Sequence, residues 1–146
     1  MNIIRYIIFV CIFAFIRADD CPSGYINNSS NSSLETEQCA PENFAYNTST
    51  QQAAYYFYEV AINEISISID DWVGAFNQDI CVGASIWDID SCNGGVCAIS
   101  VNGVDGSPFT QGYIELNDFP TFQIYDASEN TYYTATPSTQ NPWSVF

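Results

Sequence analysis

From residue 51 onward, apolar and polar positions alternate in short runs that are typical of β-strands. The clearest run is residues 65–69, where Ile and Ser alternate with a period of two, as in a strand that buries one face. Aromatic and β-branched residues dominate the other runs. The pattern predicts strands at residues 54–62, 65–69, 72–76, 80–87, 98–101, 111–116, 121–125 and 131–135. No stretch shows a helical period.

Turn-forming residues separate these runs. Gly, Asn and Asp cluster at residues 70–71, 77–79, 93–95, 102–103, 105–106 and 117–118. Short strands joined by such turns predict an all-β fold, an antiparallel β-sandwich that is Ig-like or jelly-roll-like, over residues 51–146. Residues 19–50 are polar and bracketed by cysteines, and they are predicted to form a disulfide-stapled N-terminal arm.

Residues 1–18 have the pattern of a secretory signal peptide. Arg5 precedes an apolar run at residues 6–16, Arg17 follows it, and Ala18 is a small residue suited to cleavage. A membrane-spanning helix needs about 20 residues, so this run is too short, and no later segment could span a bilayer. We therefore expect secretion to the extracellular space or cell surface. The alternative is a retained hydrophobic helix that anchors or assembles the protein.

The charge of the chain is strongly one-sided. Arg5 and Arg17 are the only basic residues among 146, against 17 Asp and Glu and no His, which gives a formal net charge of −15. Without cationic side chains beyond the leader, nucleic-acid binding is disfavoured, and neither a Ser-His-Asp site nor a His-ligated zinc site can be built. With no cations to pair with, the carboxylates are expected to repel one another and raise each other's pKa values.

Five cysteines follow the leader, which agrees with an oxidising compartment. Cys92 and Cys97 flank an Asn-Gly-Gly turn, and we expect them to form a disulfide. Cys21 and Cys39 bracket a polar segment and are predicted to form a second one. Cys81 is then left over, either as a buried inert thiol or as the partner of a cysteine in another chain.

Four Asn-x-Ser/Thr sequons lie near the N-terminal end, at Asn27, Asn28, Asn31 and Asn47. They predict N-glycosylation confined to that end of the chain, in a host with the transferase. The alternative is a disordered linker, because an Asn- and Ser-rich stretch produces such triplets by chance.

Aspartates cluster in the predicted turns, and oxygen ligands on loops are those that Ca²⁺ takes. The candidate ligands are Asp70, Asp71, Asp79, Asp88 and Asp90. The stretch from Asp88 fails as an EF-hand, because Cys92 stands at its fifth position and Ile99 at the place of the closing Glu. The alternative is that these residues are ordinary solvated turn formers.

Several phrases of the chain resemble a module of secreted and surface proteins of environmental microbes, where it is often repeated in tandem arrays. The matching phrases are CPSGY (21–25), STQQA (49–53), DWVGAF (71–76), DICVG (79–83), WD (87–88), CNGGVC (92–97), DG (105–106), GY (112–113) and PTFQIYD (120–126). The resemblance implies an extracellular β-rich building block without catalytic activity. This chain departs from the arrays in having a single copy.

Two functions are compatible with these observations. The first is a non-enzymatic structural subunit that joins head to tail with copies of itself into an extracellular fibre or coat. Its candidate assembly residues are the apolar C-terminal Trp143, Val145 and Phe146 and the strand residues Tyr56 and Tyr58. The alternative is a Ca²⁺-dependent module for carbohydrate binding or adhesion. Glycoside hydrolysis by paired carboxylates is a weaker third hypothesis.

Overall fold

A computed structural model describes residues 21–27, 39–92 and 94–145 of the chain. The predicted leader lies outside these residues. The described part has antiparallel strands and two single 3₁₀ turns, so the all-β prediction is confirmed. The strands are β1 (Tyr25–Asn27), β2 (Cys39–Pro41), β3 (Gln52–Phe57), β4 (Ala61–Ile62), β5 (Ile65–Ser66), β6 (Trp72–Asn77), β7 (Ile80–Ile86), β8 (Cys97–Asn102), β9 (Thr121–Asp126) and β10 (Thr131–Ala135). The turns are η1 (Glu42–Phe44) and η2 (Pro108–Thr110).

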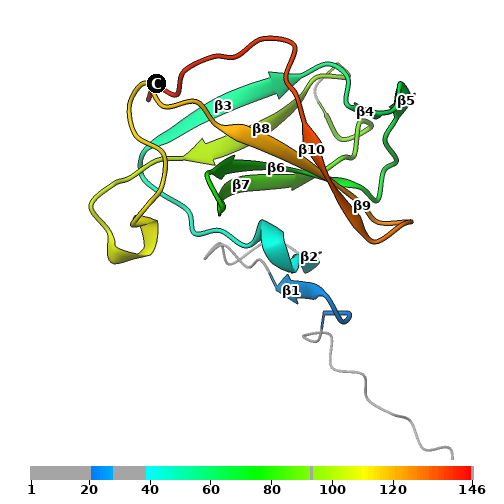
Figure 1. Ribbon diagram of the computed structural model, residues 1–146, viewed down its shortest axis with the longest axis horizontal. Coiled ribbons are helices and arrows are strands. Elements are labelled where there is room, and N and C mark those ends of the chain that lie inside the picture. The colour runs from blue at the N-terminus through cyan, green and yellow to red at the C-terminus, as the bar shows by residue number, and fades with distance from the viewer. Residues whose placement is uncertain (1–20, 28–38, 93, 146) are drawn as a thin grey trace, which may run out of the picture.

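Two sheets build the body of the molecule (Figure 1). One has four strands in the order β10-β9-β6-β7, and the other pairs β3 with β8. Among the described residues, β1 also pairs with β2, and β4 with β5, in two-stranded sheets. Every pair of strands is antiparallel. The finer prediction of an Ig-like or jelly-roll-like sandwich stays a prediction.

The main core lies between the two sheets. On β8 the side chains of Cys97, Ile99 and Val101 are buried, while those of Ala98 and Ser100 are exposed, as the period of a strand requires. These buried residues meet Val73 of β6 and Phe122 of β9 in one cluster. β8 approaches β7 so closely that a Cβ at Gly83 would lie 2.1 Å from the carbonyl oxygen of Ser100.

A second core covers the opposite face of the four-stranded sheet. Trp72 and Phe76 of β6 and Tyr125 of β9 pack there against Ala40 and Phe44 of the N-terminal arm. Phe44 is completely buried and lies edge-on to Phe76, with ring centroids 5.6 Å apart. Both faces of β6 are therefore covered, which explains why all but the last of its residues are buried. The N-terminal arm, which the sequence predicted to be polar, therefore contributes apolar side chains to a core.

Both predicted disulfides are confirmed. Cys21 is bonded to Cys39, and Cys92 to Cys97. Cys81 is a free cysteine whose side chain is buried in the second core. No helix in the described ranges is long and apolar enough to cross a membrane.

Three predicted strands differ from the structure. Residues 54–62 do not form one strand, because β3 ends at Phe57 and β4 begins at Ala61. Of residues 65–69, only Ile65–Ser66 forms a strand, Ile65 and Ile69 are exposed, and Ile67 alone reaches the main core. Residues 111–116 form no strand beyond a single bridge between Gly103 and Ile114. A turn precedes that bridge instead, with Gly112 at a φ of 81°.

Candidate functional site

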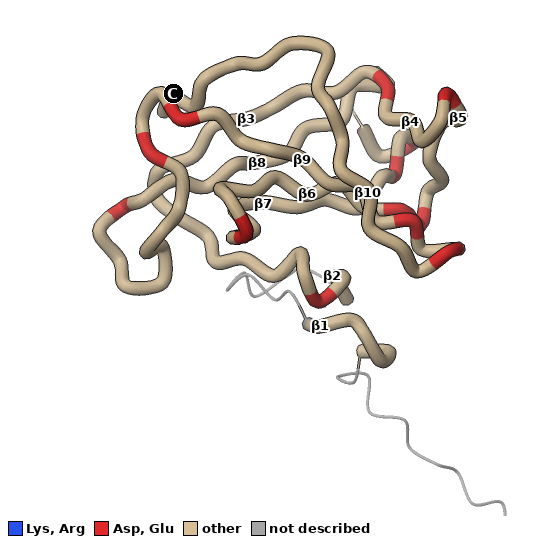
Figure 2. The backbone as a smooth tube through the Cα atoms, viewed as in Figure 1, with Lys and Arg blue, Asp and Glu red and all other residues tan. Residues whose placement is uncertain are grey.

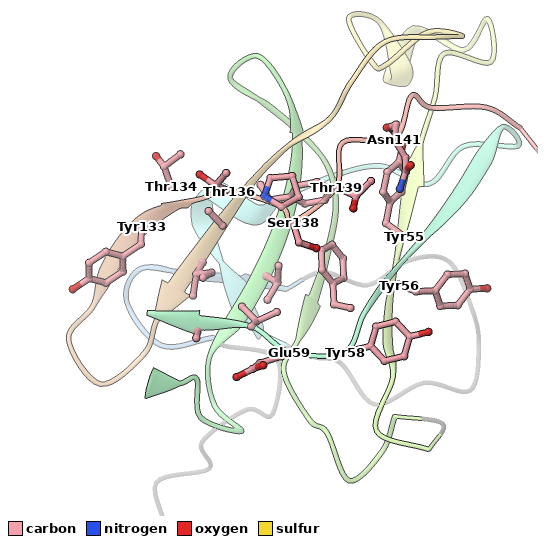
Figure 3. A pocket seen from close by; sticks show the side chains of 18 of the residues that line it. Tyr55, Tyr56, Tyr58, Glu59, Tyr133, Thr134, Thr136, Ser138, Thr139 and Asn141 are labelled. Atoms are coloured by element: carbon pink, nitrogen blue, oxygen red, sulfur yellow. Dashed lines mark hydrogen bonds between the residues drawn. The ribbon is translucent and has the colours of Figure 1, made fainter. Parts of the chain in front are cut away.

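A groove runs between β3 and the end of the chain from β10 onward. Its volume is about 900 Å³. One wall is β3 with the following residues up to Asn63, and the other comprises Tyr133 to Ser144, in part β10. Figure 3 shows labelled side chains of both walls.

The floor of the groove is apolar. Val73, Phe122 and Ile124 of the four-stranded sheet line it, together with inward-facing residues of β3. Tyr55 and Phe57 both turn toward Phe122, with ring centroids 5.8 Å and 5.3 Å away. They share this face because alternate side chains of a strand point the same way.

The β3 wall is a free strand edge. Gln52 of β3 lies opposite Asn102 of β8. The preceding pair, Gln51 and Gly103, is hydrogen-bonded, since Gly103 N–H donates to the Gln51 carbonyl at 2.8 Å. Hydrogen-bonded pairs alternate along an antiparallel ladder, so the backbone groups of Ala54 and Tyr56 point away from β8. Within the described residues, no strand pairs with that side of β3. The outer side of β10 is likewise unpaired there.

The C-terminal segment holds the opposite wall in place. The Tyr55 hydroxyl donates to the Asn141 carbonyl at 3.2 Å, across the top of the groove (Figure 3). Beyond it, Trp143 is buried in the main core. Its Nε1–H donates to the Val101 carbonyl at 2.9 Å, and its backbone N–H donates to the Asp118 carbonyl at 2.7 Å. Residues 136–142 thus form a strap between β10 and a fixed anchor.

The polar groups that line the groove are mostly hydroxyls and amides rather than charged groups. Glu59 is the only carboxylate among the described residues that line it, so the paired carboxylates of a glycosidase are not formed there. Burial raises the pKa of the Tyr55 hydroxyl. On the other wall, the Tyr133 hydroxyl donates to Glu129 at 2.6 Å, and this hydrogen bond is the main reason why its pKa is raised. Both phenols are therefore neutral donors at physiological pH.

The structure separates the candidate assembly residues. Tyr56 and Tyr58 are 64% and 78% exposed, and Figure 3 shows Tyr56 projecting away from the groove. Val145 is also exposed, and Phe146 lies outside the described residues. The prediction that Trp143 binds a partner chain is wrong, because Trp143 is buried in the core of its own chain. The prediction named Tyr56 and Tyr58 for assembly but did not identify β3 as the free edge, since a sequence does not show which strands end up at an edge.

The predicted calcium ligands are not brought together. Asp71 is buried, with one carboxylate oxygen accepting from Ser68 N–H and the other from Ala127 N–H, so it is a structural link between loops. Asp88 accepts from residues of its own turn. Asp70, Asp79 and Asp90 are exposed. In the described ranges, no three His, Cys, Asp or Glu lie close enough to hold a metal ion.

Acidic residues are spread over turns and loops instead, as Figure 2 shows. Three of them contradict the expectation of raised pKa values. Hydrogen bonds hold the pKa of Asp88, Asp105 and Asp126 below the usual range, chiefly from the Ser91 hydroxyl, the Thr50 N–H and the Ser128 hydroxyl, respectively. In these three residues, neutral hydrogen-bond donors stabilise the charged carboxylate, as cationic side chains do in other proteins.

Of the predicted glycosylation sites, Asn47 lies on a described, exposed segment. Asn27 ends β1, and Asn28 and Asn31 lie outside the described residues.

The chain matches no family model, no curated protein and no solved structure. The groove and its free edges therefore carry the functional argument.

Proposed function

We propose that the protein is a secreted, non-enzymatic structural subunit that joins to copies of itself at the groove between β3 and β10. The observation that carries this proposal is the free edge of β3 beside an apolar floor. An extended segment of a second copy would satisfy the unpaired backbone groups of Ala54 and Tyr56 and cover Phe57 and Phe122 at once.

A second copy is favoured over other occupants because the edge has none of the usual protection. Natural edge strands carry Lys, Pro or bulges that prevent pairing with another chain. β3 reads Gln-Ala-Ala-Tyr-Tyr-Phe and has no charged residue or proline. A protein that uses its edge to bind its own kind has no need of such protection. The tandem arrays that the sequence resembles also place like modules beside one another.

The contact has a direction. In the proposed contact the inserted segment is not the β3 of the second copy, so the contact is heterologous and does not close into a dimer, as two β3 edges paired with each other would. Repetition of the contact gives a filament. Since Trp143 belongs to its own core and residues 39–46 pack on their own sheet, neither supplies the inserted segment.

Substitution of Ala54 tests the proposal. Ala54→Pro removes the N–H on the free edge and leaves the β3-β8 ladder intact, because proline is tolerated on the solvent side of an edge strand. Ala54→Ser keeps that N–H and serves as the matched control. We expect the wild type and A54S to form large species in light scattering and filaments in negative stain, and A54P to remain a folded monomer. Filaments of A54P, or a monomeric wild type at high concentration, would remove the groove as the joint.

Carbohydrate binding remains a second candidate, favoured by the exposure of Tyr56 and Tyr58. On the outer face of the β3-β8 sheet, Tyr56 stands opposite the small residue Ala98, which leaves its ring open. Flat, open tyrosines stack on neutral sugars. Glycan binding by the wild type that is lost in Tyr56→Ala, with assembly unchanged, would support this function.

A further inference from the structure

The Asn47 sequon lies beside an exposed phenylalanine. The Asn47 side-chain Nδ2–H donates to the Phe109 carbonyl at 3.4 Å. Phe109 belongs to η2 and is 70% exposed, so its ring is open to a group attached nearby. η2 lies in the yellow loop of Figure 1.

The backbone around Asn47 is fixed. Its N–H donates to the Tyr113 hydroxyl at 2.6 Å, and two residues later Ser49 N–H donates to the buried Asn102 Oδ1 at 2.9 Å. Thr50 N–H follows with a bond of 3.0 Å to Asp105 Oδ2. The Cα of Asn47 is therefore held in place, and a group attached to Nδ2 begins near η2.

We propose that Asn47 is N-glycosylated and that the first sugar of the glycan packs on the Phe109 ring. In the transfer, the anomeric carbon of the sugar bonds to Nδ2 and its bond to a diphosphate oxygen of a lipid-linked oligosaccharide breaks. The diphosphate leaves with the electron pair, and one amide proton goes to solvent. Nδ2 keeps one hydrogen, so a donor for the Phe109 carbonyl remains after the transfer and the sugar starts close to η2.

A glycan is favoured over a protein partner as the group that covers Phe109, because a sugar on Asn47 would be covalently attached next to Phe109. The apolar face of a pyranose ring covers an aromatic ring, while its hydroxyls remain in water. The modification also precedes folding. Ser49, the third residue of the sequon, is buried, and its hydroxyl accepts from Gln51 N–H at 2.9 Å, so the folded chain hides it from a transferase. This inference is independent of the assembly groove.

A double-mutant cycle in protein secreted from a glycosylating host tests the proposal. The cycle comprises wild type, N47Q, F109S and the double variant, with glycopeptide mapping of each protein. We expect glycan at Asn47, a fall in Tm of about 2–4 °C for N47Q, and no such fall when F109S is already present. Trimming the glycan to its first sugar should leave the Tm of the wild type unchanged.

N31Q is the matched control, because it removes another sequon; any shift it causes should be the same with and without F109S. A bare Asn47 would overturn the proposal. So would an N47Q shift of equal size in the F109S background, or one that N31Q reproduces with the same dependence on Phe109.

Discussion

The indole ring of Trp143 lies directly on Gly103, where a Cβ would stand 2.3 Å from two ring atoms. The C-terminal segment around Trp143 and the residue that follows β8 are thus fitted to each other. This contact changes the role of the C-terminus from a free tail to the anchor of one wall of the groove.

We expect Trp143→Ala to lower the free energy of unfolding by about 3–5 kcal/mol, as for other large buried aromatics. Gly103→Ala should also destabilise, by about 1–3 kcal/mol, because the new methyl group overlaps the indole. Urea denaturation measures both. The exposed neighbour Val145 supplies the control, and Val145→Ala should change stability by less than either. Wild-type stability in W143A would show that the tail is not part of the core.

Asn102 links three segments through its buried amide. Its Nδ2 donates to the Val82 carbonyl at 2.8 Å, and its Oδ1 accepts from Ser49 N–H. Asn102→Ala leaves the Val82 carbonyl and the Ser49 N–H without these partners, at a cost of about 1–3 kcal/mol for each. We expect a large loss of stability in chemical denaturation. Ser100→Ala, on the exposed side of the same strand, should be nearly neutral, and equal effects of the two substitutions would contradict this account.

Asp105 makes the fold sensitive to acid. It accepts hydrogen bonds from Thr50, Ser107 and Thr110, and these donors hold its pKa below the usual range. A depressed pKa in the folded state means that the contribution to stability is present above the unfolded pKa of about 3.9 and is lost as the pH falls toward the folded pKa. Asp105→Asn should flatten the fall of Tm between about pH 4 and pH 2. Asp79→Asn, at an exposed site, should leave that fall unchanged.

Cys81 should be chemically inert in the folded protein. Burial raises the pKa of its thiol to about 12, and the thiolate is the reactive form. We expect no reaction with a thiol reagent at pH 8 until denaturant is added. Rapid labelling of Cys81 in the folded monomer, or a disulfide between copies through this residue, would contradict its placement in the second core.

The strands that were best predicted from the sequence, β6 and β9, are central strands of the four-stranded sheet, and most of their side chains are buried. Residues 72–76 and 121–125 lie inside β6 and β9. The Cys92–Cys97 disulfide follows from the Asn-Gly-Gly turn between its cysteines, and Cys21–Cys39 from the polar segment that those cysteines bracket. The Ile and Ser alternation of residues 65–69 was misleading, because only Ile67 finds core to pack on. A period of two shows that a strand can bury one face, but not that another sheet is present to cover it.

The candidate site was less predictable for a related reason. Trp143 looked available because it lies near the chain end, but its pocket is built by Gly103 and Val101, about 40 residues earlier. Phe44 likewise has no periodic pattern around it, yet it completes the second core. A free edge is a property of topology, since it depends on which strands lie side by side.

The most direct test of assembly at the groove is hydrogen–deuterium exchange at the free edge of β3, compared between monomeric and assembled protein. We predict that the amides of Ala54 and Tyr56 exchange rapidly in the monomer and slowly in the assembled material, while those of Ala53 and Tyr55 are protected in both. Equal and rapid exchange of Ala54 and Tyr56 in both forms would contradict the account.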